Sequence, residues 1–127
     1  MKMKAKIPTL REKYRYIYFK IHKFEENDES EEKISIGELS DVFWKTSIEI
    51  FGEIGASKGT FWIIAKEYDE EKGTGIIRCN SKTLHMLRTI LLFITEINGK
   101  KVIIHPYFAS GTLKALKRKI RKEKVKN

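Results

Sequence analysis

The side chains best suited to chemistry are four helix acids, three histidines and one cysteine. They are Glu38, Asp41, Glu49 and Glu53, then His22, His85 and His105, then Cys79. The acids share one expected helix, where exposed carboxylates ordinarily serve only to solvate the surface. The histidines fall on different elements, with no serine or thiol at an activating spacing. A single cysteine allows neither an internal disulfide nor a zinc-binding spacing. We therefore expect no catalytic residue, no metal site and no cofactor bound by the protein itself.

Basic side chains are more informative, because they gather at both ends of the sequence. The net charge is +9 over 127 residues. Residues 1–15 hold six Lys or Arg against Glu12, residues 114–127 hold eight against Glu123, and the remainder is net acidic. Such blocks attract polyanions, since neutralised phosphates release their counterions. RNA or DNA is therefore the leading partner class, and a pair of solvated tails is the alternative.

The stretch from Tyr14 to Phe24 alternates between apolar and polar residues, which predicts a half-buried strand. One face would carry Ile17, Phe19 and Ile21, and the other Tyr16, Tyr18, Lys20 and His22. Residues 25–32 hold six acids, a density typical of a loop that faces away from nucleic acid.

A capping box at Ser35–Glu38 predicts a helix that extends to about Ile54 and loosens at Gly52 and Gly55. Residues 61–68 and 75–79 then predict a β-hairpin around a turn at 69–73. Both faces of residues 61–64 are apolar, so the pattern leaves open which of them is buried.

Ser81 is expected to cap a second helix that carries apolar residues to Ile97 and is stopped by Asn98-Gly99. Residues 102–108 predict a further strand, and Pro106 suits it to a sheet edge. Residues 110–112 should cap a third helix whose polar side is basic.

This order predicts a ferredoxin-like, split βαβ fold of the α+β class in a single domain. A four-stranded antiparallel sheet would carry two helices on one face, with an extra basic C-terminal helix. The domain would span residues 1–127, with a basic N-terminal arm at 1–13 and a basic helix and tail at 112–127.

The open face of that sheet would bring two tyrosines beside a basic residue. Tyr16 and Tyr18 would lie there with Arg78, as on the base-stacking surface of RNA-recognition motifs. An equally good interpretation packs them under the third helix or a partner protein. Trp62 or Phe61 beside them would enlarge the patch into a protein interface.

Five segments, in order, resemble the archaeal ribonuclease P protein component 2 family. They are Pro8–Glu12, Phe51–Lys58, Gly75–Cys79, Ile94–Lys100 and Ser110–Lys119. The resemblance implies a ferredoxin-like core and a role in removing 5′ leaders from precursor tRNA. It also implies that the RNA subunit, with bound magnesium, is the catalyst. The implied partners are that RNA, precursor tRNA, a TIM-barrel protein called component 3 and a second copy of this chain within a heterotetramer.

Charge, position and the resemblance together nominate the residues that should face RNA. They are Arg11, Arg15, Lys58, Arg78, Lys114, Lys117, Arg118, Lys119, Arg121 and Lys122. No apolar run is long enough for a membrane helix or for the core of a signal peptide, so we expect a cytoplasmic protein without membrane contact. The alternative function is a ferredoxin-like protein-interaction or ligand-sensing domain whose basic ends only keep it soluble.

Overall fold

The computed structural model describes residues 13–24 and 33–126 of the chain. Residues 1–12 of the expected basic arm, Arg11 among them, and the acidic segment 25–32 lie outside the described residues. Among the described helices, none is long and apolar enough to cross a membrane.

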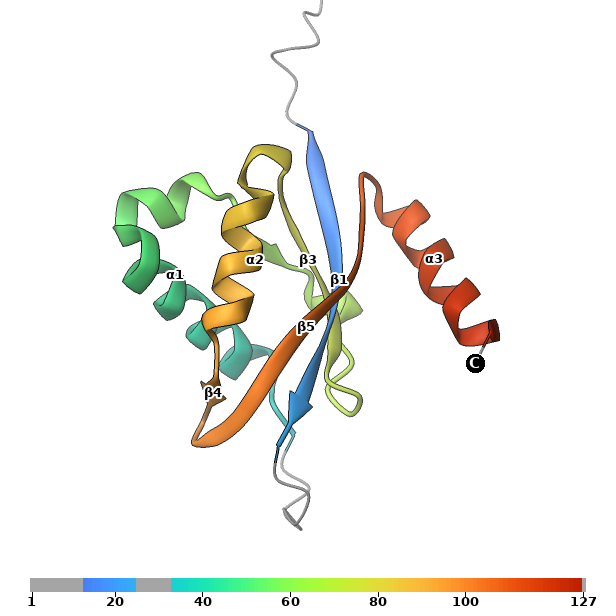
Figure 1. Cartoon of the computed structure of the whole chain (residues 1–127), viewed down its shortest axis with the longest axis horizontal. Coiled ribbons are helices and arrows are strands. Elements are labelled where there is room, and N and C mark those ends of the chain that lie inside the picture. Colours follow the sequence, from blue (N-terminus) through green and yellow to red (C-terminus); the bar gives the residue numbers. More distant parts are fainter. Residues whose placement is uncertain (1–12, 25–32, 127) are drawn as a thin grey trace, which may run out of the picture.

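The described fold is a five-stranded antiparallel sheet with helices on both faces (Figure 1). The strand order is β2-β3-β1-β5-β4, and every pair is antiparallel. The strands are β1 (Tyr14–Lys23), β2 (Trp62–Ile63), β3 (Thr74–Asn80), β4 (Glu96–Ile97) and β5 (Lys100–Ser110). The helices are α1 (Ile36–Lys58), α2 (Leu84–Phe93) and α3 (Leu113–Lys126), with short 3₁₀ turns at Ala65–Glu67 and Ser81–Thr83. Helices α1 and α2 cover one face, and α3 lies on the other.

The core lies between the sheet and the α1–α2 layer, and β1 supplies its middle. Ile17, Phe19 and Ile21 are buried, as the alternation in β1 predicts. The buried residues that pack with them from the helices and neighbouring strands are Leu39, Phe43, Ile77, Cys79, Leu87, Ile90, Leu91, Val102 and Ile104. The other face of β1 is left for α3 and for the candidate site.

The sheet has five strands where the sequence predicted four, because the second helix is shorter than expected. Helix α2 ends at Phe93, and β4 pairs with β5 instead of continuing the helix. Asn98 and Gly99 both have positive φ angles, 52° and 81°, which suit the two central residues of a tight hairpin turn. Interpreting Asn98-Gly99 as a helix stop was therefore wrong, since the pair turns one strand into the next.

The predicted capping box and the break in α1 are confirmed. The Ser35 hydroxyl accepts a hydrogen bond from the Glu38 amide, and the Glu38 carboxylate accepts one from the Ser35 amide. Gly52 has φ 77° and ψ 168°, so α1 kinks there and continues to Lys58. A positive φ is an angle that glycine adopts without steric cost.

Two other predictions about element boundaries are wrong. The strand expected at 61–68 is regular only at Trp62–Ile63, because a 3₁₀ turn follows it directly. Ser81 does not cap the second helix: Asn80 caps the 3₁₀ turn Ser81–Thr83, where its side chain accepts from the Lys82 amide, and α2 itself begins after Thr83.

The predicted cap of the third helix is confirmed, because the Thr112 hydroxyl accepts from the Ala115 amide. The prediction of an edge strand at residues 102–108 is wrong, since β5 lies between β1 and β4. Pro106 is tolerated there because β4 reaches only Lys100 and Lys101, so β5 pairs only with β1 at Pro106.

Candidate nucleic-acid interface

Helix α3 is attached to the sheet by one apolar stripe and two polar contacts. Leu116 is fully buried, and Leu113 and Ile120 beside it are half-buried. The Lys119 ammonium donates to the Ala109 carbonyl oxygen of β5 at 3.0 Å. The Lys117 ammonium pairs with the Glu67 carboxylate at 2.7 Å. The helix therefore lies on the sheet with a defined side toward solvent.

That outer side of α3 is basic, as the sequence predicts. Lys114, Arg118, Arg121 and Lys122 are all exposed, whereas Glu123 is the single acid in the helix. Lys117 differs from this set, because its ion pair with Glu67 turns it toward the sheet. The ion pair helps to fix α3 in place, and the expected RNA contact of Lys117 stays a prediction.

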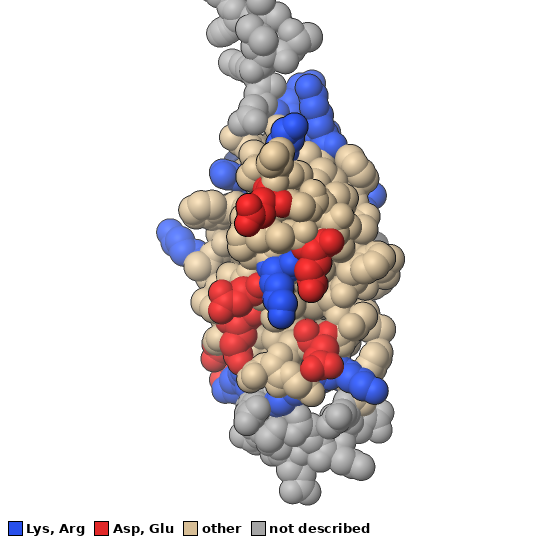
Figure 2. Space-filling view, turned by 90° about the vertical axis from the view of Figure 1, so that its left-hand side faces the viewer, with Lys and Arg blue, Asp and Glu red and all other residues tan. Residues whose placement is uncertain are grey.

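The opposite side of the molecule is mixed in charge. Helix α1 exposes Asp41, Glu49 and Glu53 together with Lys45 and Lys58. Figure 2 looks onto this side, where separate acidic patches lie around a central basic side chain and other basic side chains lie mostly toward the ends. Because a polyanion is attracted most strongly where exposed cations are not offset by acids, the α3 side is the candidate interface.

Beside α3, an aromatic and basic row crosses the same face of the sheet. The register places Arg78 of β3 directly opposite both Tyr16 of β1 and Trp62 of β2, so the three side chains share one face. The Arg78 guanidinium lies 4.6 Å from the centre of the Tyr14 ring. This confirms the predicted grouping of Tyr16 with Arg78 and adds Tyr14 to it.

The register also decides which of residues 61–64 is buried. Phe61 packs edge-on against Phe43 of α1, with ring centres 5.6 Å apart, and Ile63 pairs with the buried Ile77. Trp62 is 61% exposed. Trp62 is therefore a surface side chain, available to a ligand or a partner.

Tyr18 is different from Tyr16, because α3 lies over it. Its ring stacks on Phe108 at 6.1 Å, nearly parallel, and it lines a groove with Ile76 and Ile120 between α3 and the sheet. The interpretation that packs Tyr18 under the third helix is the one the structure supports.

The remaining predicted residues are not gathered beside α3. Arg15 donates to the neighbouring Tyr14 carbonyl oxygen at 3.0 Å, close to Gly111. Lys58 is exposed at the end of α1, in the opposite layer. Exposed Lys82 was not predicted, and its segment is joined to Lys13 of the predicted basic arm by a hydrogen bond from the Ser81 amide to the Lys13 carbonyl oxygen. A lone lysine in a short turn gives no pattern that could have identified Lys82.

The titratable groups of the described region do not assemble into a reactive site. Burial raises the pKa of Cys79 to about 11, so its thiol is protonated at neutral pH. Burial, followed by the charges of Lys20 and His105, lowers the pKa of His22, whose Nε2 lies 3.0 Å from the Tyr107 hydroxyl. No cluster of three or more potential metal ligands occurs among the described residues.

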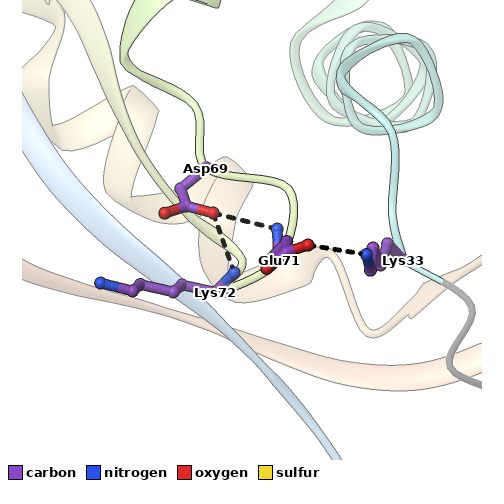
Figure 3. A network of polar contacts seen from close by, with 4 residues as sticks. All are labelled: Lys33, Asp69, Glu71 and Lys72. Carbon is purple, nitrogen blue, oxygen red and sulfur yellow. Dashed lines mark hydrogen bonds and ion pairs between the residues drawn. The ribbon is translucent and has the colours of Figure 1, made fainter.

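The carboxylates of the β2–β3 connection are engaged in local structure. Asp69 accepts from the amides of Glu71 and Lys72, at 3.0 and 3.2 Å, and so forms the turn (Figure 3). Glu71 pairs with Lys33 at 3.0 Å, which ties this turn to the segment before α1. These acids stabilise a turn rather than form an acid–base pair.

Comparisons with known proteins agree on one family. The model of the Rpp14/Pop5 family matches residues 15–121. The chain is 38% identical over 119 residues to ribonuclease P protein component 2 of Pyrococcus abyssi, covering 94% of this chain and 93% of that protein. The corresponding protein of Pyrococcus horikoshii is 39% identical over 118 residues, covering 93% and 91%.

A solved structure shares the fold. A chain in the cryo-EM structure of yeast ribonuclease MRP superimposes with a TM-score of 0.66 at 11% identity, covering 90% of this chain and 93% of that one. With a family model that matches most of the sequence and relatives alike over nearly their whole length, this chain belongs to the Rpp14/Pop5 family.

Proposed function

We propose that this protein is an RNA-binding subunit of ribonuclease P, the ribonucleoprotein that removes 5′ leaders from precursor tRNA. The observation that carries the proposal is the division of charge between the two layers. Helix α3 presents exposed lysines and arginines on one side of the sheet with Glu123 as its single acid, whereas α1 on the other side exposes acids and lysines together. The names of the relatives, ribonuclease P protein component 2, supply the kind of complex.

The protein's contribution would be to hold RNA, with the chemistry left to the RNA subunit. Exposed cations on α3 would neutralise phosphates of the folded RNA and release the counterions bound there. The RNA could then keep its compact fold at a lower salt concentration than it needs without the protein. Magnesium ions would be bound by that RNA. The described residues bring no nucleophile together with a base, which supports this division of labour.

The finer features of the fold and assembly belong to the same proposal. Without the short β4, the order β2-β3-β1-β5 is that of a ferredoxin-like split βαβ unit. Leu92 and Phe93 at the end of α2 are 75% and 60% exposed and offer an apolar contact to a protein partner. We assign such a contact to the TIM-barrel component 3 or to a second copy of this chain, in the cytoplasm.

A native purification tests the proposed function. The tagged protein, purified gently from its own cells, should carry an activity that removes 5′ leaders from precursor tRNA in the presence of magnesium. Nuclease treatment of the purified complex should abolish that activity, and the recombinant protein alone should show none. Cleavage by the RNA-free protein, surviving further purification, would contradict the proposal.

A further inference from the structure

Arg78 is a cation without an anionic partner in the described part of the chain. Its Nε atom is buried and makes no hydrogen bond there. Its guanidinium carbon lies 4.6 Å from the centre of the Tyr14 ring, and no described carboxylate forms an ion pair with it. The side chain is therefore held in place by an aromatic ring, with hydrogen-bonding capacity left over.

This arrangement favours an incoming anion. The Nε atom is closed to solvent, so an incoming phosphate would bind the terminal Nη nitrogens, and no described carboxylate forms an ion pair with the guanidinium. The planar guanidinium can donate two parallel hydrogen bonds to one phosphate, which an ammonium group cannot do. Stacking on Tyr14 fixes the plane of the group beforehand and limits the side-chain entropy lost on binding.

Trp62, one of the two residues paired with Arg78 across the sheet, can supply a second kind of contact. Trp62 is paired directly opposite Arg78, so the two side chains project from the same face at neighbouring positions. The indole is 61% exposed, and Trp62 belongs to an edge strand. Among the described aromatic pairs, no other ring stacks on it. A large, uncovered aromatic beside a phosphate-binding cation is the pairing that a nucleotide requires.

We propose that Arg78 and Trp62 form a subsite for one nucleotide of unpaired RNA, in which Arg78 binds the phosphate and Trp62 stacks on the base. The subsite extends the basic surface of α3 across the sheet to β2, and it rests on the proposed function. Unpaired RNA is favoured over a duplex because a base must leave its own stack to lie on an indole. A protein segment is less suited, since it would have to bring a carboxylate to Arg78.

The chain allows a direct optical test, because it contains only two tryptophans. Trp44→Phe leaves Trp62 as the single indole, and Trp62→Phe leaves Trp44 on α1, which is 46% exposed and lines the same hollow as Trp62. The probe is an unstructured oligouridylate of about ten nucleotides, compared with a duplex RNA of similar length. We expect saturable quenching of Trp62 emission by the oligouridylate, little quenching by the duplex, and weaker quenching of Trp44. Equal quenching of the two indoles would place the RNA in their shared hollow and overturn the subsite beside Arg78.

Variants at Arg78 test the phosphate contact. Arg78→Gln should weaken oligouridylate binding by about tenfold and flatten its salt dependence by about one contact, whereas Arg78→Lys should keep the slope. Melting curves establish that each variant is folded. An unchanged slope in folded Arg78→Gln would overturn the phosphate contact.

The outcomes separate this inference from the proposed function. If a labelled structured RNA binds and Trp62 emission does not respond to the oligouridylate, the subsite is wrong and the RNA-binding role stands. If neither RNA binds the folded protein at low salt, both proposals fail.

Discussion

Removing two exposed charges from α3 should weaken RNA binding through its salt dependence. The perturbation is the double variant Arg118→Ala with Arg121→Ala, chosen because both side chains are exposed. Lys117 is left intact, because its ion pair with Glu67 anchors the helix. The variant therefore changes the surface without releasing α3 from the sheet.

The magnitude follows from counterion release. Each lost phosphate contact reduces the slope of log affinity against log salt concentration. The reduction is about 0.9 per contact in duplex regions, if the value for duplex DNA is used, and about 0.7 per contact in single strands. Two lost contacts therefore flatten the slope by about 1.4 to 1.8. The affinity of both proteins falls when the salt concentration rises from about 50 to about 200 mM. The fold decrease should be about 7 to 12 times smaller for the variant than for the unaltered protein.

A matched control removes the same charge from the other layer. Lys45 of α1 and Arg88 of α2 are both exposed, so Lys45→Ala with Arg88→Ala also removes two positive charges. Filter binding or fluorescence anisotropy with one structured RNA, titrated with salt, gives both slopes. An equal flattening in the two double variants would refute the reasoning, because affinity would then follow net charge and not the α3 surface.

Three further predictions concern the protein alone. Trp62→Ala should change the free energy of unfolding by less than about 1 kcal/mol, while Phe61→Ala, which loses its contact with Phe43, should cost about 2 to 3 kcal/mol in denaturant melts. The Cys79 thiol should resist disulfide reagents in the native state at about pH 8 and react on unfolding. Folding raises the pKa of Cys79 from 9.0 to about 11, so the protonated thiol contributes fully to the free energy of unfolding below pH 9. This contribution should be lost as the pH rises through about 11, and the Cys79→Ala variant should not show that loss. A double-mutant cycle of Lys117→Ala with Glu67→Ala should give a coupling free energy of about 0.5 to 1 kcal/mol. A coupling of zero would show that this ion pair does not hold α3 in place.

The features that sequence predicted well are those encoded within a few residues. Alternation gave the two faces of β1, and the Ser35–Glu38 capping box marked the start of α1. The run at residues 110–112 likewise predicted a cap before α3, and Thr112 supplies it. In each case the sequence signal itself lies within a few consecutive residues.

One missed feature is local, and the others depend on contacts between distant residues. Ile94 and Ile97 continue the helical spacing of α2, and this spacing hid the Asn98-Gly99 hairpin turn that pairs Ile97 with Lys100. The partner of Lys117, Glu67, is 50 positions earlier in the chain, so no local pattern identifies that ion pair. The exposure of Trp62 was undecidable from an apolar run and followed from its register with Arg78.

The central claim is that RNA lies on the α3 side of the sheet and not on the α1–α2 side. Ultraviolet cross-linking of the native complex, followed by peptide mass spectrometry, tests it most directly. The account predicts RNA adducts on peptides from α3 and from the Trp62 and Arg78 strands, and few from α1. Adducts concentrated on α1 peptides, with α3 unmodified, would contradict it.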